Sequence, residues 1–321
     1  MIKVDLITGF LGSGKTTFIT GYAKYLVGQG KKIGIIENDY GAVNVDMLLL
    51  TEALKELPEG SCRLEMVIGS DPDCHRRRLK TKLIAMAMLG LDTVLVEPSG
   101  IFDVDEFFDI LYEEPLDRWY QIGNVIALTD AGLEKPLSEE SEYILVSQIS
   151  KAGALVLTRE DQVSREKLEE TRSYIDSCLE KYKLRPHSHV IPLSLPEITD
   201  EDYKSITSCG YRSDDHIKLG VAEENDFISL FFFHVKTPVE RLETTIREIF
   251  EDKTCGQVFR IKGFIKDKEG WLELNATRDQ VSIKPVKTGQ ELFIVIGEKL
   301  IQDQVGKHWD SYLNEYVSEP R

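Results

Sequence analysis

One short glycine-rich stretch near the start of the chain constrains the fold more than any other feature. Residues 9–17 read Gly-Phe-Leu-Gly-Ser-Gly-Lys-Thr-Thr, the complete pattern G-x-x-x-x-G-K-T of a phosphate-binding loop. Glycine lets the backbone wrap tightly around an anion with its N–H groups pointing inward. Residues 2–7 alternate as a strand does, and residues 15–27 carry apolar side chains at helical spacing. The sequence therefore predicts a strand, a loop and a helix, with an anion held at the helix N-terminus.

The polar positions of this loop each have an expected role. Lys15 is placed to reach the β- and γ-phosphates of a nucleoside triphosphate, and the Thr16 hydroxyl to bind Mg²⁺. We also expect Lys15 to act in catalysis, because its charge stabilises the charge that develops on a transferred phosphoryl group. The other loop residues expected to bind the nucleotide are Gly9, Gly12, Ser13, Gly14 and Thr17.

Composition narrows the classes of partner and location. The chain has 321 residues, enough for a full core and two domains. No apolar run reaches the roughly 20 residues that span a membrane. The chain enters its first strand at once, so we expect no signal peptide and a cytoplasmic protein. The 39 basic and 55 acidic side chains give a net charge of −16, which argues against nucleic acid as the main partner. The five scattered cysteines predict reduced thiols rather than a disulfide framework.

Strand-like and helix-like segments alternate through the first two-thirds of the chain. After the loop and its helix, we expect strands at 32–37, 93–97, 122–128, 154–157 and 190–193, and helices at 76–89, 104–111, 138–150 and 162–182. This alternation predicts an α/β fold, a doubly wound and mostly parallel sheet covered by helices.

The pattern changes near residue 200, which predicts a second domain. Residues 198–226 are polar and turn-rich, and we interpret 201–226 as a connector. A P-loop domain would then occupy residues 1–200 and a smaller α+β domain residues 227–321. In the second domain we expect a helix at 239–250, a short helical tail near 309–316, and strands at 228–235, 257–265, 271–275, 280–283 and 291–296.

Acidic residues that follow two of the predicted strands complete the expected nucleotide site. Glu97 ends an apolar strand, and ligands of open α/β sheets bind at the carboxyl ends of such strands. We expect Glu97 to hold Mg²⁺ together with Thr16 and to take part in catalysis, and the backbone of Gly100 to face the γ-phosphate. Glu37 and Asp39 end another strand and can serve Mg²⁺, the catalytic water or a second metal.

A four-residue segment after the strand at 154–157 is expected to contact the base. Thr158-Arg159-Glu160-Asp161 stands where GTPases usually carry Asn-Lys-x-Asp. Asp161 can accept hydrogen bonds from guanine N1–H and N2–H₂, which adenine does not offer, and Arg159 can stack on the ring. Thr158 replaces the amide of the usual motif. These residues predict a preference for guanine, and the use of ATP stays an alternative.

Together these motifs resemble the CobW-like family of P-loop GTPases, relatives of the nickel-insertion GTPases for urease and hydrogenase. The resemblance covers nearly the whole chain. Its segments are 6–17, then 37–41, which is similar to E-N-E-F-G, 97–100, which is similar to E-T-S-G, 128–131, 148–161, 260–263 and 292–297. It implies a GTP-binding protein that hydrolyses GTP slowly, with Mg²⁺, to drive maturation, or metal or cofactor delivery, for a client protein.

The chain departs from this family at the transition-metal motif. The family usually carries G-C-x-C-C, which binds a metal such as Zn²⁺, whereas residues 61–64 here read Ser-Cys-Arg-Leu and keep none of the three motif cysteines. Cys62, Cys74 and His75, which we place in one loop region, are chemically adequate for a relocated Zn²⁺ site. Their spacing matches no standard metal motif.

Three functions remain open from the sequence. The first is a GTPase that serves maturation or delivery for a client. The second is a metallochaperone that itself binds Zn²⁺, Ni²⁺ or Co²⁺ through the relocated ligands. The third is a nucleotide-gated adaptor with little hydrolysis. The client, the metal and a homodimeric state are not determined by the sequence.

Overall fold

A computed structural model describes most of the chain, and the contacts divide it into two compact units, Met1–Gly220 and Val221–Arg321. The described residues are 1–10, 12–39, 45–68, 72–98, 104–212, 227–235, 237–278 and 280–309.

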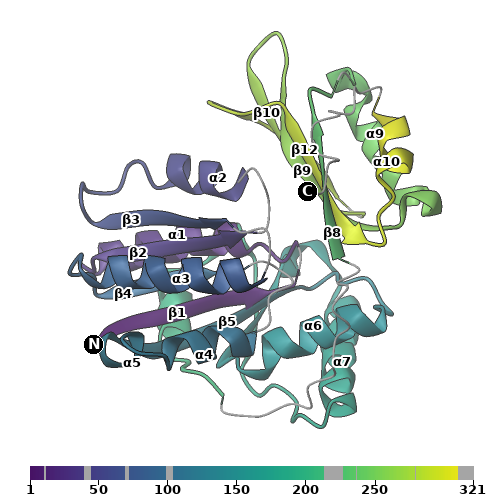
Figure 1. The fold of residues 1–321 in the computed structure, drawn as a ribbon. Coiled ribbons are helices and arrows are strands. Elements are labelled where there is room, and N and C mark those ends of the chain that lie inside the picture. The colour runs from purple at the N-terminus through teal and green to yellow at the C-terminus, as the bar shows by residue number, and fades with distance from the viewer. Residues whose placement is uncertain are drawn as a thin grey trace. The chain divides into compact units, whose positions relative to one another are not determined.

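A parallel sheet forms the centre of the first unit (Figure 1). Its strands in the described residues are β1 (Ile2–Gly9), β2 (Ile33–Asp39), β3 (Cys62–Ile68), β4 (Thr93–Glu97), β5 (Tyr120–Asp130), β6 (Ala154–Thr158) and β7 (Val190–Leu193). Their spatial order is β3-β2-β4-β1-β5-β6-β7, and every neighbouring pair is parallel. Strands β4 and β6 are buried along their whole length, as a sheet covered on both faces requires.

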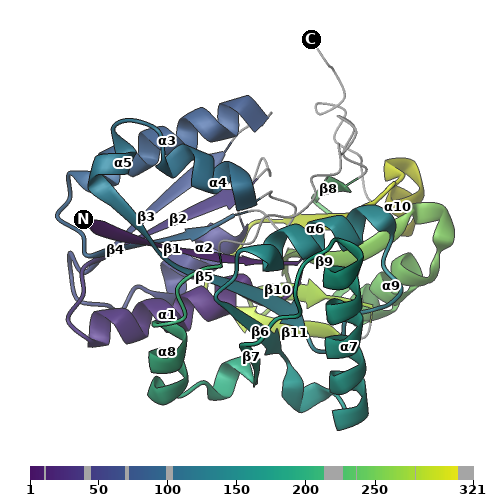
Figure 2. The ribbon, with the colours of Figure 1, turned by 90° about the horizontal axis from the view of Figure 1, so that it is seen from below.

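Helices cover both faces of this sheet, with α3, α4 and α5 on one face and α1 and α8 on the other (Figure 2). The helices of the first unit are α1 (Lys15–Gly28), α2 (Val45–Ala53), α3 (Pro72–Ala87), α4 (Val104–Leu111), α5 (Leu116–Trp119), α6 (Glu139–Ser150), α7 (Arg165–Lys181) and α8 (Asp200–Ile206). This arrangement confirms the predicted doubly wound α/β fold. Within the described residues, none of the helices has the length and apolar character needed to cross a membrane.

Helix α8 corrects the prediction that residues 198–226 are turn-rich. A capping box starts this helix, because the Thr199 hydroxyl accepts from the Asp202 N–H and the Asp202 carboxylate accepts from the Thr199 N–H. Tyr203 stacks on Tyr25 of α1 with ring centroids 5.3 Å apart, and Ile206 is fully buried. The helix buries few residues and exposes the rest, so its sequence looks polar. Residues 213–226 of the expected connector lie outside the described part of the chain.

The second unit is a smaller α+β domain, as expected. Its antiparallel sheet has the order β11-β10-β9-β12-β8. The strands are β8 (Phe227–Phe233), β9 (Gln257–Lys266), β10 (Trp271–Ala276), β11 (Val281–Val286) and β12 (Leu292–Glu298), and the helices are α9 (Val239–Glu251), the 3₁₀ turn η3 (Lys253–Cys255) and α10 (Gln302–His308). Trp309 follows α10 and stacks on Phe293 of β12, with ring centroids 5.1 Å apart. The helical tail predicted near 309–316 falls almost entirely outside the described residues.

Candidate nucleotide and magnesium site

The glycine-rich loop lies between β1 and α1, as the sequence predicts. Gly12 and Gly14 have φ values of 79° and 87°, in the left-handed region that glycine adopts without steric strain. A Cβ on Gly9 would lie 2.2 Å from the carbonyl oxygen of Leu128 on β5, so any larger residue there would push the loop away from the sheet. Close approach and left-handed backbone explain why this loop needs glycine.

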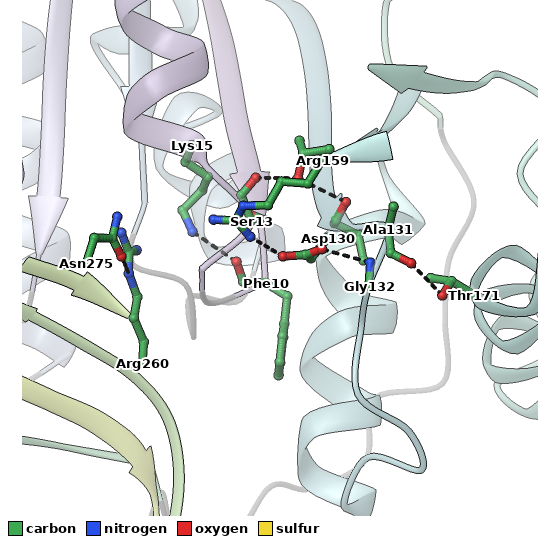
Figure 3. Close-up of polar contacts among 12 residues, drawn as sticks. Phe10, Ser13, Lys15, Asp130, Ala131, Gly132, Arg159, Thr171, Arg260 and Asn275 are labelled. Atoms are coloured by element: carbon green, nitrogen blue, oxygen red, sulfur yellow. Dashed lines mark hydrogen bonds and ion pairs between the residues drawn. The ribbon is translucent and has the colours of Figure 1, made fainter. Parts of the chain in front are cut away.

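Lys15 and Ser13 place polar groups inside the loop. The Lys15 ammonium donates to the carbonyl oxygens of Gly9 at 2.8 Å and Phe10 at 3.4 Å (Figure 3). The Ser13 hydroxyl is buried and has no hydrogen-bond partner within the described residues. A buried polar group without a partner raises the free energy of the fold, and a phosphate oxygen would satisfy it. The loop therefore fits a phosphate ligand. Thr17, the last residue expected to bind the nucleotide, lies exposed on the first turn of α1.

Two buried carboxylates and one hydroxyl meet beside the loop. Glu37 on β2 and Glu97 on β4 are register partners on adjacent parallel strands. Their Cα atoms are therefore roughly 4.8 Å apart, and both side chains leave the same face of the sheet. Glu37 is 3% exposed and Glu97 4%. The Thr16 hydroxyl donates to Glu97 Oε1 at 3.1 Å. Mg²⁺ prefers such oxygen ligands, so these three residues fit a magnesium site.

Two other expected site residues have no described side chain. Asp39 ends β2, and only its backbone is described. Gly100 lies beyond the described segment that ends at residue 98. Their roles toward Mg²⁺ and the γ-phosphate stay predictions.

Thr158, at the end of β6, binds the loop itself. Its fully buried hydroxyl donates to the carbonyl oxygen of Ser13 at 2.9 Å. The sequence places Thr158 near the base but carries no signal for this contact, because the two residues are 145 positions apart. The bond connects the carboxyl end of β6 to the phosphate loop.

Arg159 and Asp130 form an ion pair at the same edge of the sheet (Figure 3). Arg159 adopts a left-handed backbone with φ of 57°, and its guanidinium donates to Asp130 Oδ2. Asp130 Oδ1 accepts the N–H of Gly132 at 2.8 Å. Asp130 orients the Arg159 guanidinium, and we did not predict this role. Its position just after the predicted strand at 122–128 is a signal that the sequence does carry. Stacking of Arg159 on a base stays a prediction.

Asp161 is available to a base. It lies in a 3₁₀ turn, Glu160–Gln162, that follows β6. Its side chain is exposed and has no hydrogen-bond partner within the described residues. An exposed carboxylate at this edge of the sheet can accept two hydrogen bonds from guanine.

The structure does not bring together the backbone positions of Cys62, Cys74 and His75, which we predicted to form a relocated metal site. Cys62 opens β3 and pairs with Ile33 at the amino end of the sheet. Cys74 and His75 instead lie in the first turns of α3, which follows the carboxyl end of β3. The sheet's parallel order puts these two ends on opposite edges.

The packing of α3 shows how far apart these residues are. A Cβ added to Gly34 of β2 would lie 2.6 Å from the Met86 sulfur, so the last turn of α3 packs against Gly34. Gly34 pairs with Arg63, next to Cys62, so this turn lies beside the strand end that holds Cys62. Cys74 lies twelve residues earlier, about 18 Å along the helix.

The loop, its lysine and the buried carboxylates all meet at the carboxyl edge of one parallel sheet. This arrangement defines the first unit as a P-loop nucleotide-binding domain. The family description "CobW/HypB/UreG, nucleotide-binding domain" matches residues 3–185, more than half of the chain. The protein belongs to this family.

Curated relatives of known role match the chain at low identity. The zinc chaperone YeiR of Escherichia coli (strain K12) is 28% identical over 177 residues, covering 52% of this chain and 49% of YeiR. The zinc chaperone YjiA of the same strain is 28% identical over 187 residues, covering 55% of each. Zinc-regulated GTPase metalloprotein activator 1 of Dictyostelium discoideum is 25% identical over 306 residues, covering 82% of this chain and 62% of that protein. The chain spans about half the length of the two bacterial relatives.

Proposed function

We propose that this protein binds and hydrolyses GTP, and that hydrolysis drives delivery of a metal or cofactor to a client protein. The observation that carries the proposal is the pair of buried carboxylates, Glu37 and Glu97, with the half-buried Thr16 bound to Glu97, beside a complete phosphate loop. The relatives support the delivery role, because two are zinc chaperones and one is a zinc-regulated GTPase metalloprotein activator.

The residues of the loop divide the work of binding the triphosphate. Backbone N–H groups at residues 12–14 would hold the phosphates, and Lys15 would leave the carbonyls of Gly9 and Phe10 to reach the β- and γ-phosphates. Thr16, Glu37 and Glu97 would hold Mg²⁺, which supplies positive charge that offsets the charge of the phosphates. Lys15 would stabilise the charge that develops on the transferred phosphoryl group.

The end of β6 would select the base. Asp161 is exposed and would accept from guanine N1–H and N2–H₂. The ion pair between Arg159 and Asp130 would hold the guanidinium beside the base. Thr158 would keep the phosphate loop in place through Ser13.

GTP hydrolysis would change the affinity for the client through the loops that follow β2 and β4. Residues 40–44 and 99–103 of these loops lie outside the described part of the chain, and we expect loss of the γ-phosphate to reshape the loops and so change the affinity for a partner. The first unit would bind Zn²⁺ more weakly than relatives with three clustered cysteines, because Cys62 is distant from Cys74 and His75.

A lysine pair on one helix tests the nucleotide role. Lys15→Ala removes the ammonium that reaches the phosphates, and we expect it to abolish GTP binding and hydrolysis while the far-ultraviolet circular dichroism spectrum is unchanged. Lys24→Ala is the matched control, because Lys24 lies exposed on the same helix. Calorimetry and phosphate release measure the two activities. Wild-type GTP affinity in Lys15→Ala would refute the proposed function.

A further inference from the structure

A cysteine, a histidine and an aspartate meet in the second unit, which contains none of the residues assigned above. One potential ligand atom each of Asp252, Cys255 and His308 lies within 4.8 Å of the other two. Asp252 caps the end of α9, Cys255 ends η3, and His308 ends α10. Figures 1 and 2 show α10 beside α9. The cluster therefore joins three elements at one place.

The backbone around the cluster is held firmly. The Ile301 N–H, just before α10, donates to the carbonyl oxygen of Cys255 at 3.0 Å. Val305 and Trp309 on either side of His308 are fully buried in the core of this unit. The position of His308 relative to Cys255 is thus set by core packing and a backbone hydrogen bond.

The carboxylate and the imidazole of the cluster are oriented as metal ligands would be. Asp252 Oδ1 accepts both the N–H and the hydroxyl of Thr254, at 2.9 and 2.7 Å, which leaves Oδ2 turned toward His308. Asp252 Oδ2 lies 2.9 Å from His308 Nε2. The other ring nitrogen, Nδ1, lies 3.9 Å from Glu248 Oε2. A carboxylate behind a histidine is the usual partner that orients a metal-binding imidazole.

Access and donor chemistry also fit a metal. Cys255 is fully buried, whereas the side chains of Asp252 and His308 are 31% and 20% exposed, so the cluster opens to solvent on their side. Sulfur, imidazole nitrogen and carboxylate oxygen together favour Zn²⁺ or Co²⁺ over Mg²⁺ or Ca²⁺. Ligand atoms of tetrahedral zinc lie about 3.4 Å apart, so contraction by less than about 1.5 Å completes the set.

We propose that Asp252, Cys255 and His308 form a site for Zn²⁺ or Co²⁺ in the second unit, with water as the fourth ligand. On binding, the Cys255 thiol gives its proton to solvent, and the thiolate and the Asp252 carboxylate together balance the charge of the divalent ion. An open fourth position is typical of sites that exchange a ligand, in contrast to closed structural sites with four protein ligands. The site requires no nucleotide.

Cobalt titration of the full-length, nucleotide-free protein tests this site. We expect a thiolate-to-cobalt charge-transfer band that saturates at one Co²⁺ per chain. Cys255→Ala should remove the band. His308→Gln should weaken binding, and Glu248→Gln should weaken it by about 10–100-fold, the usual effect of losing the group behind a metal-binding histidine. If Cys255→Ala fails to fold, the affinities of the other two variants decide.

Three controls separate this site from the rest of the protein. His234→Gln changes an exposed histidine of the same unit that also lies beside a carboxylate, Glu291 at 3.0 Å, and should bind Co²⁺ as the wild type does. Cys74→Ser and Lys15→Ala should also leave the band unchanged, whatever becomes of nucleotide binding. Absence of the band in the wild type, its persistence in Cys255→Ala, or its loss in Cys74→Ser would overturn the proposal.

Discussion

Replacing Thr158 with valine should loosen the phosphate loop without disturbing the shape of the core. The Thr158 hydroxyl donates to the Ser13 carbonyl at 2.9 Å, and both residues are buried. Valine keeps the volume and removes the donor, so the Ser13 carbonyl would remain buried without this bond. That loss lowers the free energy of unfolding by about 1–3 kcal/mol. A unit of this size then melts about 2–4 °C lower for each kcal/mol.

The same change should weaken triphosphate binding. In Thr158→Val the phosphate loop loses the hydrogen bond that holds Ser13, so GTP must supply the free energy that orders the loop. The affinity for GTP then falls about tenfold for every 1.4 kcal/mol of this free energy. Calorimetric titration with GTP and thermal unfolding, each on the nucleotide-free protein, measure the two effects.

Two controls isolate the hydroxyl. Thr158→Ser keeps the donor and should retain wild-type affinity. Thr129→Val changes a neighbouring threonine on β5 whose buried hydroxyl has no partner within the described residues, so stability should be unchanged or higher. The reasoning is refuted if Thr158→Val binds GTP and melts as the wild type does, or if Thr129→Val shows the same losses.

Three further predictions concern the base, the pH response and helix α8. Asp161→Ala should reduce the preference for GTP over ATP by about tenfold or more, since charged hydrogen bonds contribute about 1.5–3 kcal/mol, and equal ratios in calorimetry would contradict this. Burial lowers the pKa of His187, whose ring bonds the Ala152 carbonyl at 2.8 Å. The unfolded chain then takes up the proton first, so stability should fall as pH drops below about 6.5, and His187→Gln should flatten that part of the stability curve. Tyr203→Ala should lower the free energy of unfolding by about 3 kcal/mol in denaturant titrations, because Tyr203 packs on α1; a change under about 0.5 kcal/mol would show that α8 is not part of the core.

The sequence by itself determined the features that depend on neighbouring residues. The phosphate loop, the flanking strand and helix, and the apolar strand ending at Glu97 are local patterns, and the structure has them where they were predicted. The helix Val104–Leu111 matches the predicted range, because its apolar spacing is strong. The parallel sheet follows from the alternation of such segments along the chain.

Only the tertiary structure decided which distant residues meet. Thr158 and Ser13 are 145 positions apart, and no local pattern relates them, whereas Thr16 and Glu97, 81 positions apart, were paired only through their motifs. We predicted that Cys62 shares one loop region with Cys74 and His75 because they are close in sequence. Strand β3 starts at Cys62 and separates it from the other two.

Two of the features that the sequence did not predict have a common physical cause. Helix α8 buries few residues, so its periodicity is weak, and its place is decided by the aromatic rings of α1 against which Tyr203 packs. Asp252, Cys255 and His308 sit at the ends of separate elements, and the core contacts of Val305 and Trp309 bring them together. Local propensity selects the elements of this protein, whereas burial of their apolar faces selects the neighbours that make its sites.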